Sequence, residues 1–178
     1  LHNEDADART ANLLSNLYNN LSNTYLLMKR GNEAAKALRT AFNIRMEYAH
    51  LGLTESHDSL QQMMNLINML LLAKDVDNAK IVLNQYETLS DTSLDYGICK
   101  LSRGIIEMME GMPESAEMNL LGAENIIENV VGMDNEYMKT TYRYLNNLYA
   151  RWKKPEKAIK YRDKFLGVRR SQFLSKTE

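Results

Sequence analysis

The sequence predicts an all-α fold, a right-handed superhelical solenoid of four helix–turn–helix repeats with about eight helices. Two observations predict it: a composition that disfavours strands, and an internal repeat of small and large apolar residues. Gly and Pro together number 10 among 178 residues, and Val numbers 5 against 25 Leu. Strand-rich folds need β-branched residues and frequent turn residues, so a mostly β fold is excluded.

The repeat is defined by one alanine that recurs at the same place in four segments. Each segment has alanine sixteen residues after its first residue. The segments are 18–41, 63–86, 100–123 and 142–165, and their alanines are Ala34, Ala79, Ala116 and Ala158. The fourth residue after each alanine is Leu38, Leu83, Leu120 and, as an exception, Arg162. Because small residues let helices approach closely, this spacing predicts helix pairs that stack on their neighbours.

Apolar residues at helical spacing predict the helices of the first two repeats. We expect helices over 8–29 and 32–51, the second of which ends at Gly52 with His50 in its last turn. The second repeat predicts helices over 57–73 and 76–89. Asp75 or Asp77 would cap the N-terminus of the latter helix.

The third and fourth repeats predict helices over 92–110, 113–131, 135–152 and 155–173. Ser90 or Asp91 would cap the first of these. The only prolines, Pro113 and Pro155, each stand three residues before the repeat alanine. Proline is tolerated in the first turn of a helix, so both prolines mark the start of a second helix.

The third repeat departs from the pattern in its first helix. Lys100, Arg103 and Glu107 occupy positions that pack between helices in the other repeats. Either this helix is rotated about its axis, or Arg103 and Glu107 form a partly buried ion pair. The cost of burying two charges favours rotation. The adjacent face is apolar and holds Ile98, Leu101, Ile105 and Met108.

Further residues of each repeat carry a resemblance to a known family. The first repeat has Leu21, Ser22 and Tyr25 ahead of its alanine, and the third has Gly104 ahead of its own. This pattern resembles the tetratricopeptide repeat. The alanines lie 45, 37 and 42 residues apart, further than the about 34 residues of the common form, which resembles the kinesin-light-chain variant. The resemblance covers about residues 13–168 and implies a concave groove that holds an extended peptide.

The domain organisation follows from the same pattern. We expect one domain over 1–178, with repeats at about 8–51, 57–89, 92–131 and 135–173. Because the chain begins at Leu1, we also expect it to be a fragment of a longer protein.

Charge and hydropathy exclude several classes of function. The 22 basic and 23 acidic residues leave a net charge of −1, so we expect no nucleic-acid partner. The segment from Arg151 to Arg170 has nine basic residues against two acidic ones, which is typical of a solvated outer face. It would also suit an acidic partner, a nucleic acid or a membrane surface. The longest apolar run has five residues, so we expect no membrane span. With no secretory signal and one free cysteine, we expect a cytoplasmic protein.

Residues that could support catalysis are sparse. The sequence has no phosphate-binding loop, dinucleotide fingerprint or zinc-protease motif, so we expect no enzyme, cofactor or metal. His50 and His57 flank one turn and could bind a metal only with Glu55 or Asp58 as a third ligand; helix-end roles are the simpler interpretation. Cys99 lies among apolar residues and is expected to pack rather than react.

The asparagines are the best candidates for a binding site. The chain has 18 of them, although asparagine is a mediocre helix former. Asn19 and Asn23 share one face of the first helix, and Asn68 and Asn147 align with Asn23 in other repeats. Asn65 and Arg143 stand close to these positions in sequence. Carboxamides can pair with any peptide backbone and arginine with a carboxylate, although these residues could also merely solvate a surface or bridge helices.

The resemblance implies that these first-helix positions line the groove, so the predicted ligand-binding residues are Asn19, Asn23, Asn65, Asn68, Arg143 and Asn147. If the apolar face of the third repeat is exposed, Ile98, Leu101, Ile105 and Met108 form an apolar pocket there; if the helix is rotated, they are ordinary core.

The function predicted is therefore a non-catalytic module that binds a protein or peptide partner. The alternative is a ligand- or peptide-sensing regulatory domain of a bacterial transcriptional regulator, in which similar repeats follow a DNA-binding domain. The sequence does not determine the oligomeric state.

Overall fold

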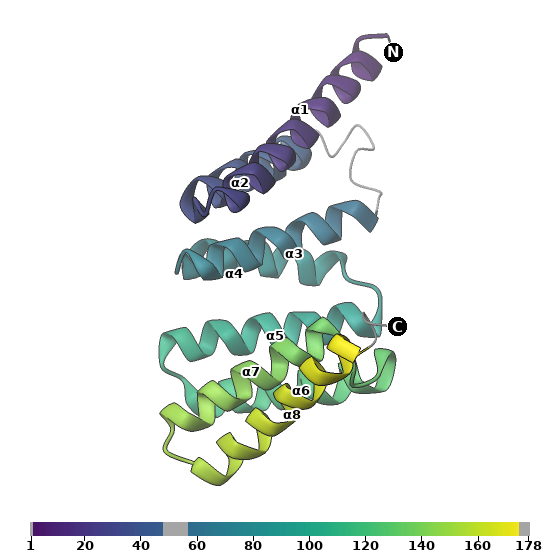
Figure 1. Cartoon of the computed structure of the whole chain (residues 1–178). Helices are drawn as coiled ribbons and strands as arrows, with labels where there is room; N and C mark the ends of the chain where they lie inside the picture. The colour runs from purple at the N-terminus through teal and green to yellow at the C-terminus, as the bar shows by residue number, and fades with distance from the viewer. Residues whose placement is uncertain (1, 48–56, 175–178) are drawn as a thin grey trace. The chain divides into compact units, whose positions relative to one another are not determined.

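The computed structural model describes residues 2–47 and 57–174. Within these ranges the chain is all-α, with eight helices and no strand (Figure 1). The helices are α1 (His2–Leu27), α2 (Gly31–Glu47), α3 (His57–Leu72), α4 (Val76–Leu89), α5 (Ser93–Glu110), α6 (Pro113–Val131), α7 (Glu136–Arg151) and α8 (Pro155–Leu174). The all-α prediction is confirmed. The predicted stop at Gly52 lies outside the described residues.

The helices form two compact units, Leu1–Tyr86 and Glu87–Glu178. In the first unit α1 packs on α2 and α2 on α3. In the second unit α5 packs on α6, α6 on α7, and α7 on α8. Both units therefore consist of stacked helices, while a single continuous domain and a right-handed superhelix stay predictions.

The repeat alanines lie in the core, as predicted from their spacing. Ala34, Ala79 and Ala116 are 0% exposed, and Ala158 is also buried. The positions four residues after these alanines are buried where they hold leucine, at Leu38, Leu83 and Leu120. Arg162, which replaces leucine in the fourth repeat, is exposed. Buried alanines leave room for the partner helix of each pair, which is the physical basis of the repeat.

The turn inside each repeat has one geometry, which the sequence does not reveal. The residue five positions before the repeat alanine has a left-handed backbone in all four turns, with φ between 54° and 77°. These residues are Lys29, Lys74, Gly111 and Lys153. In each turn the next backbone N–H donates to a carbonyl five residues earlier, for example Met112 N to Glu107 O at 2.9 Å. This six-residue closure ends the first helix and reverses the chain.

The helix starts confirm some predicted caps and correct another. Asp75 precedes α4 and accepts a hydrogen bond from the backbone N–H of Asn78 at 3.4 Å, as expected of a cap. Pro113 and Pro155 are the first residues of α6 and α8. The prediction of Ser90 or Asp91 as the cap of α5 is wrong, because Thr92 has the extended backbone and accepts from Asp95 N at 3.1 Å.

The charged residues of the third repeat find partners on other helices. Arg103 pairs with Glu87, while Glu107 accepts hydrogen bonds from Ser115 at 2.8 Å and from Asn119. The alternative of an Arg103–Glu107 ion pair is therefore wrong. Each group keeps partial access to solvent, which avoids the penalty of burying both charges.

Two glycines allow α5 and α6 to approach each other closely. A Cβ added to Gly104 would lie 2.7 Å from Leu120 Cγ and 3.2 Å from the Leu120 backbone nitrogen. At Gly97 it would lie 2.9 Å from Ile127 Cγ1. Leu120 and Ile127 are fully buried, so their side chains have little room to move.

We expect Gly104→Ala to lower the free energy of unfolding of the second unit by about 1–3 kcal/mol, because the added methyl overpacks the α5–α6 contact. Trp152, the only tryptophan, lies in this unit, so its fluorescence in a urea titration reports the loss. Gly167→Ala is the matched control, since no described atom beyond its chain neighbours and its own helix backbone lies within 4 Å of its added Cβ, and alanine is the better helix former. Equal unfolding midpoints for Gly104→Ala and wild type would contradict the close contact.

Candidate functional site

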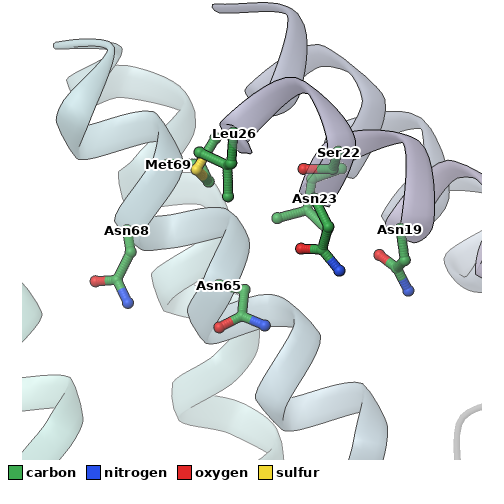
Figure 2. A pocket seen from close by; sticks show the side chains of 8 residues that line it. Asn19, Ser22, Asn23, Leu26, Asn65, Asn68 and Met69 are labelled. Carbon is green, nitrogen blue, oxygen red and sulfur yellow. The ribbon is translucent and has the colours of Figure 1, made fainter. Parts of the chain in front are cut away.

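The first unit contains a cavity lined by four of the predicted asparagines. Its volume is about 420 Å³, within the range of ligand-binding pockets. Asn19 and Asn23 reach it from α1, and Asn65 and Asn68 from α3. Figure 2 shows the four carboxamides projecting to the same side of these two helices. Asparagines from two repeats therefore line one cavity.

The floor of this cavity is apolar and fixed. Leu38 and Met69 are buried, whereas Leu26 at the edge is half exposed. Ser22, the small residue of the first repeat, donates a hydrogen bond from its hydroxyl to the Ala34 carbonyl oxygen at 2.9 Å. This bond ties α1 to α2 and holds the asparagine-bearing face of α1 in place.

One polar atom at the cavity lacks a partner in the part of the chain that the structure describes. Asn19 Oδ1 is buried and accepts no hydrogen bond within the described residues. A buried acceptor without a donor is costly, so such atoms are normally satisfied by protein, water or ligand. A bound N–H group would supply the missing donor.

Arg143 and Asn147 lie in the second unit, on one face of α7. Both side chains are exposed, and the Arg143 guanidinium lies 5.2 Å from the centre of the Tyr144 ring. The structure thus brings together four of the six predicted ligand-binding residues in the first unit, and the other two belong to the second unit.

The apolar face of α5 is mostly buried. Ile98, Leu101 and Ile105 are buried, as the alternative of ordinary core requires. Met108 is half-buried and borders a cavity of about 310 Å³ together with Met112 and Trp152. The four residues therefore do not line one pocket among the cavities found in this part of the chain.

The structure gives Cys99 the environment of a packing residue. Its side chain is 1% exposed, and burial raises the pKa of its thiol to about 11, so a reactive thiolate is disfavoured at neutral pH.

Among the described residues no cluster of His, Cys, Asp and Glu could hold a metal ion. His50 and Glu55, and the side chains of His57 and Asp58, lie outside the described residues. None of the helices that the structure describes has the length and apolar character needed to cross a membrane.

Two lysines of the basic segment meet two carboxylates of α6 in an ionic network that the sequence does not reveal. Lys157 and Lys164 of α8 pair with Glu117 and Glu124 of α6. Tyr149 donates to Glu117 at 2.7 Å, and Tyr161 donates to Glu124 at 2.8 Å. Burial opposes ionisation of Glu117, but the bonds from Lys157 and Tyr149 outweigh it and lower the pKa of that carboxyl. Part of the basic segment therefore stabilises the fold.

Comparison with known proteins supports the fold assignment. No model of a known protein family matches the sequence, and no curated protein sequence does. Among solved structures, the crystal structure of BtubC (BKLC) from P. vanneervenii is similar, with a TM-score of 0.67 and 20% sequence identity. The alignment covers 91% of this chain and 65% of that one, so the chain spans less than two thirds of the similar structure. The likeness supports a tetratricopeptide-like helical-repeat fold; the kinesin-light-chain variant stays a prediction.

Proposed function

We propose that this chain is a non-catalytic protein-interaction module whose first unit binds an extended peptide segment through its asparagine cavity. The observation that carries the proposal is the convergence of four carboxamides from two repeats on one cavity, where the buried acceptor Asn19 Oδ1 has no donor among the described residues. The helical-repeat fold, similar to BtubC, is compatible with this role.

The cavity suits a peptide backbone. Each carboxamide offers two donors and one acceptor oxygen, so it can pair with both groups of a peptide unit whatever the neighbouring side chains are. Leu38 and Met69 offer an apolar floor for one side chain of the partner. The site therefore selects an extended segment with an unpaired backbone and one apolar anchor.

A separate contact is proposed for α7 of the second unit. Arg143 is proposed to pair with a carboxylate, either an acidic side chain or a C-terminus, and Asn147 to bond the adjacent backbone. Both side chains are exposed and four residues apart, so one ligand segment can reach both.

The test uses peptides selected on the wild-type chain from a displayed random library. We expect the double variant Asn19→Ala/Asn68→Ala to bind the selected peptides about ten-fold more weakly by fluorescence polarisation, because two hydrogen bonds are lost. The melting temperature should change little, since Asn68 is exposed and Asn19 only half-buried. Arg143→Ala should weaken only peptides that carry a carboxylate.

Asn84→Ala is the matched control, because Asn84 is an exposed asparagine of α4 outside the cavity. Unchanged affinity of the double variant would refute the asparagine site, and failure to select any peptide would refute peptide binding altogether.

A further inference from the structure

The second unit has a cavity of its own, which the proposed peptide site does not use. Its volume is about 310 Å³, at the lower end of the range for small-molecule sites. The lining residues belong to 108–113, at the end of α5 and the start of α6, and to 148–152, at the end of α7. Both walls of the cavity therefore come from consecutive repeats of one unit.

The backbone of both walls is fixed by the turns that end α5 and α7. Gly111 has a left-handed backbone with φ of 77°, and the backbone N–H of Met112 donates to Glu107 O at 2.9 Å. The backbone N–H of Trp152 donates to Leu148 O at 2.9 Å, and the Leu148 side chain is buried. Because these bonds hold the walls in the absence of a ligand, binding requires little ordering of the protein.

The interior of the cavity favours an aromatic ring. The thioether side chains of Met108 and Met112 line it together with the indole of Trp152. Thioethers are flexible and polarisable, and they contact aromatic rings favourably. The Lys154 ammonium lies 3.1 Å from the centre of the Trp152 ring, so one face of the indole is already covered. The ligand body that suits a cavity of this size is a single ring with a short side chain.

Arg151 is the one charged residue among those that line the cavity. The residue is exposed, and its guanidinium makes no hydrogen bond or ion pair with any described residue. Glu110 and Glu114 flank the turn in sequence but do not line the cavity. A guanidinium can pair with both oxygens of a carboxylate. The cavity is therefore complementary to a carboxylate that is attached to an apolar body.

We propose that this cavity binds a small aromatic carboxylate, with the ring beside Met108, Met112 and Trp152 and the carboxylate on Arg151. A free molecule suits the site better than a peptide segment. The Arg151 guanidinium and the Trp152 indole N–H are the polar side-chain groups of the lining residues, so a peptide backbone would find few partners there for its own N–H and C=O groups. The ligand thus differs in class from the extended segment proposed for the asparagine cavity.

The test follows the fluorescence of Trp152, because it is the only tryptophan of the chain and lines the cavity. We expect hydrocinnamate, a phenyl ring on a short carboxylate arm, to change this fluorescence saturably with a dissociation constant of about 0.1–1 mM. Hydrocinnamide has the same shape without the charge and should bind at least about five-fold more weakly, because it cannot form the ion pair. No saturable change with hydrocinnamate, or equal affinity for the acid and the amide, would overturn the proposal.

Two variants separate the charge from the apolar wall. Arg151→Met should lower the affinity for hydrocinnamate to that for the amide and leave binding of the amide unchanged. Met112→Ala should weaken binding of both ligands, since it removes part of the wall. Both residues are exposed, so the unfolding midpoint in urea should not change. Arg162→Met is the matched control, at an exposed arginine of α8 outside the cavity, and should bind hydrocinnamate like wild type. An Arg151→Met variant that still prefers the acid would contradict the ion pair.

Two further comparisons identify the cavity and the class of ligand. The double variant Asn19→Ala/Asn68→Ala should bind hydrocinnamate like wild type, because both substitutions lie in the first unit. Loss of binding in this variant would assign the ligand to the asparagine cavity and overturn the proposal. A capped dipeptide of phenylalanine and aspartate presents a similar ring and carboxylate from a peptide, and it should bind more weakly than hydrocinnamate. Tighter binding of the dipeptide would overturn the assignment to a free small molecule.

Discussion

Raising the pH above about 10 is expected to unfold the second unit, because three tyrosines there must ionise inside the protein. The rings of Tyr142, Tyr149 and Tyr161 form one cluster, with Tyr161 lying 6.1 Å from Tyr142 and 5.6 Å from Tyr149 between ring centres. All three side chains are buried. A phenolate in this cluster would lose its hydration and face the carboxylates of α6.

The direction of this change in stability with pH follows from the pKa values of the three tyrosines. Burial raises the pKa of Tyr142 to about 12, and Glu124 and Glu128 add to the shift. Burial also raises the pKa of Tyr149 and of Tyr161, which donate to Glu117 and Glu124. Since the folded values exceed the unfolded value, the contribution to stability is complete below about pH 10 and is lost as the pH rises toward 12 and beyond. A pKa raised to about 12 makes the contribution of Tyr142 alone about 3 kcal/mol.

The measurement is a titration of helix content by circular dichroism, followed in parallel with tyrosinate absorbance. Tyr142→Phe is the informative variant, because the Tyr142 hydroxyl has no hydrogen-bond partner within the described residues. Its removal should leave the neutral protein at least as stable and should move the alkaline midpoint to higher pH. An alkaline midpoint that does not move, or tyrosinate that forms while the helices persist, would contradict the role of the cluster.

The sequence predicts the fold well because the signal for it is local. The repeat alanines, the prolines at the starts of α6 and α8, and the apolar spacing between them depend only on neighbouring residues. The left-handed turns at Lys29, Lys74 and Lys153 were not predicted, because lysine does not indicate a positive φ as glycine does. The cap of α5 was misassigned because Ser90, Asp91 and Thr92 are all good caps and only the backbone distinguishes them.

The candidate site is predicted less completely, because part of it depends on contacts between repeats and not on neighbouring residues alone. Asn19 and Asn23, and likewise Asn65 and Asn68, are spaced by three or four residues, so periodicity alone puts each pair on one helix face. That the pairs share a cavity depends on packing between repeats, and the unpartnered oxygen of Asn19 depends on three-dimensional placement. The bonds from α8 to α6 join residues about forty positions apart, and no local pattern specifies such pairs.

Removing the ammonium group of Lys164 is expected to destabilise the second unit by about 2 kcal/mol, because it leaves the carboxylate of Glu124 buried without its cation. The side chain of Glu124 is 11% exposed and that of Lys164 33%, so solvent replaces the lost partner only in part. The Lys164 ammonium also lies 5.0 Å from the centre of the Tyr142 ring, a contact that a methionine cannot make.

The variant is Lys164→Met, which keeps the length and apolar body of the side chain, and the unfolding midpoint in urea is read from Trp152 fluorescence. Lys157→Met is the matched control on the same helix, and we expect it to cost less than about 1 kcal/mol because Lys157 is 53% exposed in its pair with Glu117. Adding Glu124→Gln to Lys164→Met should restore part of the loss, since a neutral amide still accepts the hydrogen bond of Tyr161 and leaves no stranded charge. If the two lysine variants lose equal stability, or if Glu124→Gln deepens the loss, burial of Glu124 is not what makes this ion pair important.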